Sequence, residues 1–200
     1  MKGIIDSAPD ISKIDVTPTG YSTTVLAANG EETATLVGQG ANRQYVTIDE
    51  IPLDLQHAFV AIEDERFYDH NGIDLHGIGR AFISGLSKGR FSEGASTITQ
   101  QLIKNNVLTS WTSETSFVEK LQRKIQEQYL ALELEKQVND KDWILENYMN
   151  SVNLGANTLG VQAASKKYFN KDVSELTLSV SICHRRYHSE SIRLQPYHTP

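Results

Sequence analysis

Apolar residues recur at helical spacing over most of the chain, and the clearest run lies between residues 115 and 137. Its members stand at i, i+4 intervals and are Phe117, Val118, Leu121, Ile125, Tyr129 and Leu132. This spacing predicts an amphipathic helix of about 20 residues.

Shorter helices are predicted on both sides of this run. The one over residues 52–67 follows cap residues Thr47 and Asp49 and has Pro52 in its first turn, both typical of a helix start. The same signals predict helices over residues 75–86, 96–106, 140–152, 160–169 and 173–180.

The first 50 residues differ in composition, because they are rich in turn formers and β-branched side chains. Asn29-Gly30 lies between two runs of alternating β formers. This pair is a strong hairpin signal because a type I′ turn needs positive φ at both central residues. We therefore predict a hairpin over residues 21–37 in front of a mainly α domain.

Composition narrows the class of protein. With 200 residues, 39% hydrophobic and 22% charged, the chain has the size and make-up of one globular domain with a short appendage. Its net charge is −6, from 19 basic and 25 acidic residues, which argues against a nucleic-acid partner. One cysteine, Cys183, excludes an intramolecular disulfide, and no apolar run of 18 residues or export signal is present.

Three consecutive acids, Glu63, Asp64 and Glu65, stand near the end of the first predicted helix. Exposed acids there oppose the helix dipole at a cost of about 0.3–1 kcal/mol each, so a role other than stability is one interpretation. A solvated acidic turn with Arg66 as local partner is the other.

The stretch Gly94-Ala95-Ser96-Thr97 runs directly into the predicted helix over 96–106. Free amides and hydroxyls at such a start can bind phosphate, and Gln100 and Lys104 follow on one helix face. An ordinary helix cap with polar residues facing water explains the pattern equally well.

On the long helix, Lys120, Arg123, Lys124 and Glu127 fall within an arc of about 100°, on the side away from Ile125. Such a face could hold a diphosphate, or it could be a solvated face with i, i+4 ion pairs. The histidines His70 and His76 match no helical zinc spacing, so no metal ligand is assigned.

Taken in order, these segments resemble the motifs of the peptidoglycan glycosyltransferase family, found in class A penicillin-binding proteins and monofunctional murein polymerases. The matching stretches, between residues 58 and 178, are EDERFYDHNGID from Glu63, GASTITQQ from Gly94, RKIQE from Arg123, ILENYMN from Ile144 and GVQAA from Gly160.

The resemblance implies a lysozyme-like, two-lobed α fold. It also implies a glycosyl-transfer reaction. Lipid II units are joined when the 4-hydroxyl of one sugar attacks the anomeric carbon of an α-linked undecaprenyl diphosphate, giving a β-1,4 bond with inversion. Such a displacement needs a base on the hydroxyl and positive charge near the departing diphosphate.

Carried over residue by residue, the resemblance makes Glu63 the general base and Glu127 a second carboxylate near the diphosphate. Lys104, Arg123 and Lys124 match the phosphate-binding cations. The donor side of the cleft is then lined by Ser96, Thr97, Gln100, Gln101 and Arg66.

The resemblance also implies a divalent metal, Mg²⁺ or Mn²⁺, at the diphosphate, and lipid II and the growing glycan strand as partners. Family members carry an N-terminal membrane helix, and class A proteins a C-terminal transpeptidase domain. We therefore expect a fragment of a parent anchored at the outer face of the bacterial cytoplasmic membrane, which it contacts through that helix.

These expectations divide the chain into a linker with the hairpin (1–50), the glycosyltransferase domain (51–180) and an off-pattern tail (181–200). The tail holds Cys183, His184 and His188 and lacks the alanine-rich helix and Asn-Pro-Ser loop of the family. Our hypothesis is that a frameshift produced it, and that it is poorly ordered.

Two other functions are consistent with the sequence. A lysozyme-type hydrolase could use two glutamates, although hydrolysis leaves the cations around Glu127 without a role. A binding module for a lipid diphosphate or a protein partner, without catalytic activity, is the alternative from outside the enzymes.

Overall fold

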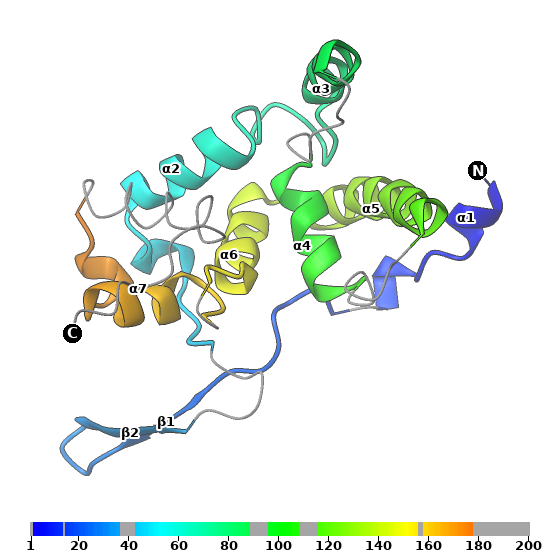
Figure 1. Ribbon diagram of the computed structural model, residues 1–200. Coiled ribbons are helices and arrows are strands. Elements are labelled where there is room, and N and C mark those ends of the chain that lie inside the picture. The colour runs from blue at the N-terminus through cyan, green and yellow to red at the C-terminus, as the bar shows by residue number, and fades with distance from the viewer. Residues whose placement is uncertain are drawn as a thin grey trace, which may run out of the picture. The chain divides into compact units, whose positions relative to one another are not determined.

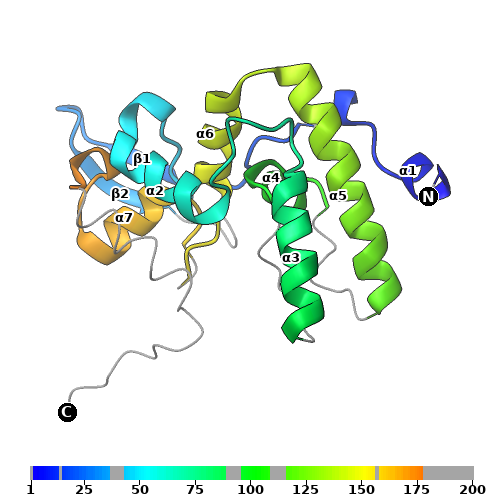
Figure 2. The ribbon, with the colours of Figure 1, turned by 90° about the horizontal axis from the view of Figure 1, so that it is seen from above.

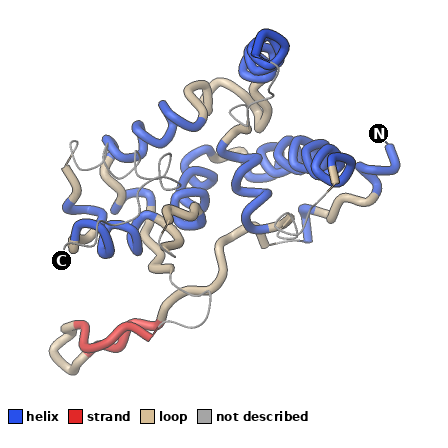
Figure 3. Tube along the Cα trace, viewed as in Figure 1, coloured by secondary structure: helices blue, strands red, loops and turns tan. Residues whose placement is uncertain are grey.

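The structure, a computed structural model, describes residues 2–13, 15–36, 43–88, 96–108, 116–155 and 158–177. After a short helix and a 3-10 turn at the N-terminus, two strands precede the main series of helices (Figures 1 and 3), which confirms the predicted mainly α, lysozyme-like class with a hairpin in front of the domain. The elements are α1 (Lys2–Asp6), η1 (Ile11–Lys13), β1 (Thr23–Leu26), β2 (Glu32–Leu36), η2 (Ile48–Glu50), α2 (Leu53–Glu63), α3 (Leu75–Lys88), α4 (Ile98–Asn106), α5 (Phe117–Val138), α6 (Lys141–Ser151), α7 (Val161–Phe169) and η4 (Val173–Glu175).

The chain forms two compact units. The first unit comprises Met1–Pro18 and Phe59–Ser151, and the second comprises Thr19–Ala58 and Val152–Pro200. Each has its own set of buried apolar side chains.

In the first unit, α4 lies between α5 and α6 and packs on both (Figure 2). Short apolar repeats on the three helices supply the core because i, i+3 and i+4 positions share a face. Its fully buried side chains include Phe59, Phe67, Ile98, Leu102, Ile103, Leu130, Ile144, Leu145, Tyr148 and Met149.

Helix α5 confirms the long helix predicted from the sequence. The face that it buries is not the face that carries the predicted apolar stripe. Ser116 and Glu119 form a capping box at its start. Phe117 and Val118 are 79% and 62% exposed, while Leu130 and Ala131 are fully buried. Burial follows the tertiary neighbours of the helix, not the position of the apolar stripe.

Helix α2 ends at Glu63, four residues before the predicted end. The next residue, Asp64, still donates its N–H to the Val60 carbonyl at 2.9 Å, but its buried carboxylate contacts the start of α4, and the chain then turns. A contact with a distant segment therefore sets the end of this helix.

The hairpin forms between β1 and β2, but its turn is not type I′. Gly30 has φ of 85°, whereas Asn29 is not in the left-handed region. The Gly30 N–H donates to the Ala27 carbonyl at 2.9 Å, and the Ala27 N–H donates to the Glu31 carbonyl at 2.8 Å. With the irregularity between Val25 and Leu26, this is the pattern of a type I turn followed by a left-handed glycine.

The second unit buries apolar residues from η2 to α2 and from the segment around α7. They are Val46, Ile51, Leu55, Val152, Leu154, Val161, Ala163, Ala164, Val173 and Leu176. The helix predicted over 173–180 is wrong in its described part: one 3-10 turn, η4, is followed by extended Leu176. Residues 178–180 and the predicted off-pattern tail lie outside the described residues.

Among the described residues, we find no helix with the length and apolar character needed to cross a bilayer.

Candidate active site

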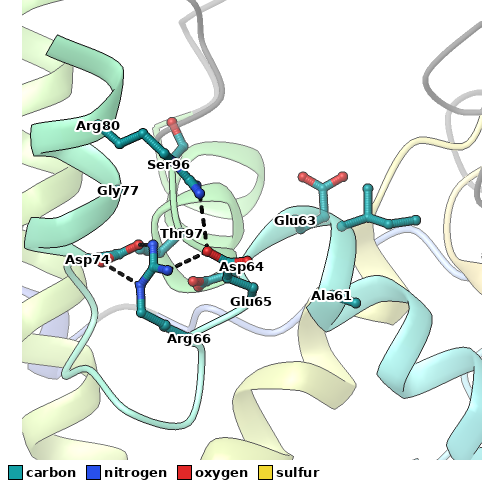
Figure 4. A pocket seen from close by; sticks show the side chains of 11 residues that line it. Ala61, Glu63, Asp64, Glu65, Arg66, Asp74, Gly77, Arg80, Ser96 and Thr97 are labelled. Atoms are coloured by element: carbon teal, nitrogen blue, oxygen red, sulfur yellow. Dashed lines mark hydrogen bonds and ion pairs between the residues drawn. The ribbon is translucent and has the colours of Figure 1, made fainter. Parts of the chain in front are cut away.

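A polar hollow in the first unit collects several of the residues singled out in the sequence (Figure 4). Its lining comes from the end of α2, the turn after it, the start of α3 and the two residues before α4. The predicted site residues among them are Glu63, Arg66, Ser96 and Thr97. Segments more than 30 positions apart in the sequence thus contribute to one surface.

Arg66 is held in this hollow by two acids. Its Nη2 lies 2.6 Å from Asp74 Oδ2 and its Nε 3.2 Å from Asp74 Oδ1, a two-point contact, and it also pairs with Glu65. Glu65 accepts in addition from Arg80 at 3.2 Å. The hydrogen bonds that Arg66 donates to Asp74 lower the pKa of Asp74 to about 2 and raise the pKa of Arg66. The guanidinium is therefore a fixed, permanently charged group.

Glu63 is the last residue of α2 and its side chain is half-buried. It points away from the Arg66 cluster, as Figure 4 shows. Gln101, on α4, donates from Nε2 to Glu63 Oε2 at 2.9 Å. A neutral amide thus holds one oxygen of this carboxylate.

The neighbouring Asp64 joins three segments of the first unit. Its buried carboxylate accepts from the Ile98 N–H at 3.0 Å, at the first residue of α4. The Nε2 of His70 lies 2.9 Å from its other oxygen, and His70 Nδ1 accepts from the Gly72 N–H at 3.2 Å. His70 thus supports the turn after α2.

The start of α4 is an ordinary helix cap. The Thr97 hydroxyl oxygen accepts from the Gln100 N–H at 3.2 Å and donates to the Gly72 carbonyl at 2.8 Å. Because Ile98 and Gln100 already use their amides, these two groups are engaged within the protein instead of facing an anion. Of the two interpretations of this segment, the structure favours the cap.

Glu127 lies on α5 and is 1% exposed, between two cations. Arg123 pairs with its Oε1, and Lys124 Nζ lies 2.8 Å from its Oε2. Lys124 also donates to the Ser96 Oγ at 2.8 Å. One buried carboxylate and two cations leave this cluster with a net charge of +1, suited to an anionic ligand. Lys120, on the same helix, is exposed.

The other predicted residues of α4, Gln100 and Lys104, do not line the hollow. Gln100 is 3% exposed and donates to the Gly72 carbonyl at 3.3 Å, so its side chain supports the turn after α2. Lys104, one turn further on, is half-buried in the last turn of the helix.

A continuous chain of contacts connects the two predicted carboxylates. Glu63 contacts Gln101, whose Nε2 also lies 3.5 Å from the Ser96 carbonyl. Ser96 contacts Lys124, and Lys124 contacts Glu127. Glu63 and Glu127 therefore stand at opposite ends of one hydrogen-bonded series.

Three further residues of the site were not assigned from the sequence. Asp74 forms an ion pair with Arg66, and Arg80 forms one with Glu65. Tyr148, on α6, donates its hydroxyl to Gln101 Oε1 at 3.2 Å. Its place in ILENYMN indicated only a helix with apolar positions, so nothing local pointed to this contact.

The side chains of the site supply few ligands for the divalent metal that the resemblance implies. No group of three or more His, Cys, Asp or Glu side chains able to hold an ion occurs within the described ranges. Glu127, the carboxylate nearest the predicted diphosphate, is engaged by Arg123 and Lys124. These residues do not form a protein-held metal site.

Comparison with known proteins places this geometry in context. Residues 29–197 match the model of the family described as Transglycosylase. The chain is 50% identical over 143 residues to penicillin-binding protein 1A of Clostridium botulinum (strain Hall), covering 68% of this chain and 16% of that protein.

Two Bacillus subtilis proteins are also similar. Penicillin-binding protein 1F is 44% identical over 158 residues, covering 79% of this chain and 21% of that protein. Penicillin-binding protein 1A/1B is 39% identical over 176 residues, covering 88% of this chain and 18% of that protein. The chain thus spans about a fifth or less of the curated relatives that it matches.

Proposed function

The chain belongs to the transglycosylase family, and on that basis we propose that it is a peptidoglycan glycosyltransferase that polymerises lipid II into β-1,4-linked glycan. The observation that carries the proposal is the contrast between two carboxylates. Glu63 accepts from the neutral amide of Gln101, and buried Glu127 accepts from two cations. Carboxylates in such different environments can take different roles in one reaction.

Glu63 is the general base of this proposal. The 4-hydroxyl oxygen of the acceptor sugar attacks the anomeric carbon of the donor, and Glu63 takes the hydroxyl proton as the new C–O bond forms. The bond between the anomeric carbon and the diphosphate oxygen breaks, and its electron pair leaves with the undecaprenyl diphosphate. A single displacement of this kind inverts the anomeric centre.

The cluster of Arg123, Lys124 and Glu127 acts on the leaving group. Its net positive charge opposes the negative charge that grows on the diphosphate. Glu127 fixes the directions of the two cations, so they need no reorganisation during the reaction. Lys104 adds positive charge along the donor's path, whereas Asp74 and Glu65 offset the charge of Arg66.

The partners follow from the substrate. Lipid II and the growing strand meet at the surface of the membrane that holds their lipid tails, and we place this activity at the outer face of the bacterial cytoplasmic membrane. The exposed apolar residues Phe117, Val118 and Leu121 at the start of α5 support a contact with lipid. Any divalent metal is held in this proposal by the diphosphate itself, and no step depends on it.

Incubation with lipid II tests the proposal. Glycan length and released undecaprenyl diphosphate are followed for the wild type, Glu63→Gln and the control Glu31→Gln, which makes the same charge change on the exposed turn of the hairpin. We expect polymer from the wild type and the control, and loss of at least about 10²-fold in Glu63→Gln.

The other outcomes identify the alternatives. Full activity in Glu63→Gln contradicts the assignment of the base. Binding of lipid II without turnover by the wild type indicates a binding module, and shortening of preformed glycan without release of diphosphate indicates a hydrolase.

A further inference from the structure

Tyr148 and Gln101 form a relay that ends on Glu63. The Tyr148 hydroxyl lies 3.2 Å from Gln101 Oε1, and the opposite end of the same amide, Nε2, lies 2.9 Å from Glu63 Oε2. Tyr148 comes from α6 and Gln101 from α4, two helices that pack on each other. The relay therefore connects the core of the first unit with its polar hollow.

The Tyr148 end of the relay is rigid. The side chain is fully buried, and its ring meets Phe59 edge to face, with ring centroids 6.2 Å apart. Burial raises the pKa of Tyr148, so its hydroxyl keeps its proton at any working pH. The group is therefore a fixed hydrogen-bond donor.

A fixed donor selects one orientation of the Gln101 amide. With Oε1 accepting from Tyr148, Nε2 points at Glu63 and donates to it. The flipped amide would place Oε1 against the Glu63 carboxylate, where two acceptors repel each other and the hydrogen bond to Glu63 is lost. Tyr148 thus controls which end of the amide Glu63 meets.

We propose that Tyr148 and Gln101 are positioning residues for the general base: through the oriented amide they fix the direction of the Glu63 carboxylate and favour its ionised form. This inference rests on the proposed role of Glu63 and adds to it a support that spans two helices. A hydrogen bond donated to a carboxylate favours the charged state, which is the state that accepts a proton.

Other charged side chains line the same hollow and contribute to the electrostatic environment of Glu63. They are Asp64, Glu65, Arg66, Asp74 and Arg80. These groups pair with one another or with His70, as described above, and Lys124 reaches the hollow through Ser96. A change at Tyr148 leaves all of these pairs in place, so its effect on Glu63 runs through Gln101.

The test uses Tyr148→Phe, which keeps the ring and removes only the hydroxyl. Tyr168→Phe is the matched control, because the Tyr168 hydroxyl donates to the Leu154 carbonyl at 2.9 Å within the second unit. In lipid II polymerisation by the full chain, Tyr148→Phe is expected to lower kcat about tenfold, with KM within about twofold, and to move the acid limb of the rate profile to higher pH. Tyr168→Phe is expected to leave that limb unchanged.

A second readout does not depend on turnover. The Glu63 carboxyl carbon, labelled and followed by NMR in the absence of lipid II, is expected to titrate at higher pH in Tyr148→Phe than in the wild type and Tyr168→Phe. Gln101→Glu, which sets a second carboxylate beside Glu63, is expected to move the titration further in the same direction.

The titration separates this inference from the proposed function. A Glu63 titration that is the same in the wild type, Tyr148→Phe and Gln101→Glu overturns the positioning role, whatever the chain does with lipid II. A shift confined to the relay variants supports the role, including in a chain that makes no glycan. Thermal unfolding of each variant verifies that the comparison is made on folded protein.

Discussion

Gly72 is the position where the structure gives the most direct estimate of a single substitution. Its φ is 86°, and a Cβ at this residue would lie 2.7 Å from the Ala131 carbonyl oxygen and 2.8 Å from its carbonyl carbon. These are backbone atoms of α5, which cannot move aside as a flexible side chain could. Gly72→Ala therefore combines a disfavoured backbone conformation with a steric overlap.

The two contributions can be worked out separately. A left-handed conformation costs an L-residue about 1–2 kcal/mol, and forcing an extra methyl into a packed region costs about 1–3 kcal/mol. Gly72→Ala should therefore lower the free energy of unfolding by about 2–5 kcal/mol. Gly30→Ala is the control, since Gly30 has φ of 85° and nothing lies within 4 Å of its added Cβ. Only the conformational cost, about 1–2 kcal/mol or less, applies there.

Urea and thermal unfolding of the full chain measure both variants. The Gly72 carbonyl accepts from Thr97 and Gln100, so displacement of this turn should also lower polymerisation activity. Equal losses of stability in the two variants would refute the steric reasoning, and a Gly72→Ala protein as stable as the wild type would refute the whole estimate.

Three further predictions concern charge. Lys124→Ala should lower lipid II turnover about 10²-fold, as measured by release of undecaprenyl diphosphate. Lys120→Ala, on the same helix but exposed, should change it less than about twofold. Arg66 lowers the pKa of Asp74 to about 2, so the ionised carboxylate is expected to stabilise the fold above about pH 4, and this stabilisation is expected to be lost as the pH falls toward 2. Unfolding curves of Asp74→Asn should lack that pH dependence. Electron paramagnetic resonance should detect no Mn²⁺ binding to the protein alone below about millimolar concentration, but should detect binding once lipid diphosphate is present. Tight binding to the free protein would contradict this expectation, which rests on the lack of a cluster of metal-ligating side chains in the described ranges.

Local signals predicted most of the helices because the spacing of apolar residues is itself local, although α1 was not predicted and the helix over 173–180 was wrong in its described part. The end of α2 and the buried face of α5 were predicted less well, since both depend on tertiary contacts. Asp64 ends α2 by contacting Ile98, 34 positions away. Phe117 stays exposed although it belongs to the apolar stripe, because the packing partners of α5 lie further along the helix.

For the candidate site as well, local contacts could be predicted from the sequence and long-range contacts could not. The i, i+4 relation of Arg123 and Glu127 is visible in the sequence, and the structure realises it as an ion pair. That Glu127 is buried was not visible, since a solvated face has the same pattern. The contact between Gln101 and Tyr148 joins residues 47 positions apart and leaves no trace in the periodicity of either helix.

The buried carboxylate of Asp64 has a consequence for the entropy of the reaction. Asp64 directly follows Glu63, and its carboxylate accepts from the N–H of Ile98, the first residue of α4. Ile98 lies two positions after Ser96. Glu63, the proposed base, and the Ser96 hydroxyl that contacts Lys124 are therefore attached to one rigid junction. Their relative freedom is lost when the chain folds, before any sugar arrives, so binding of the two substrates need not supply the ordering of base against cation.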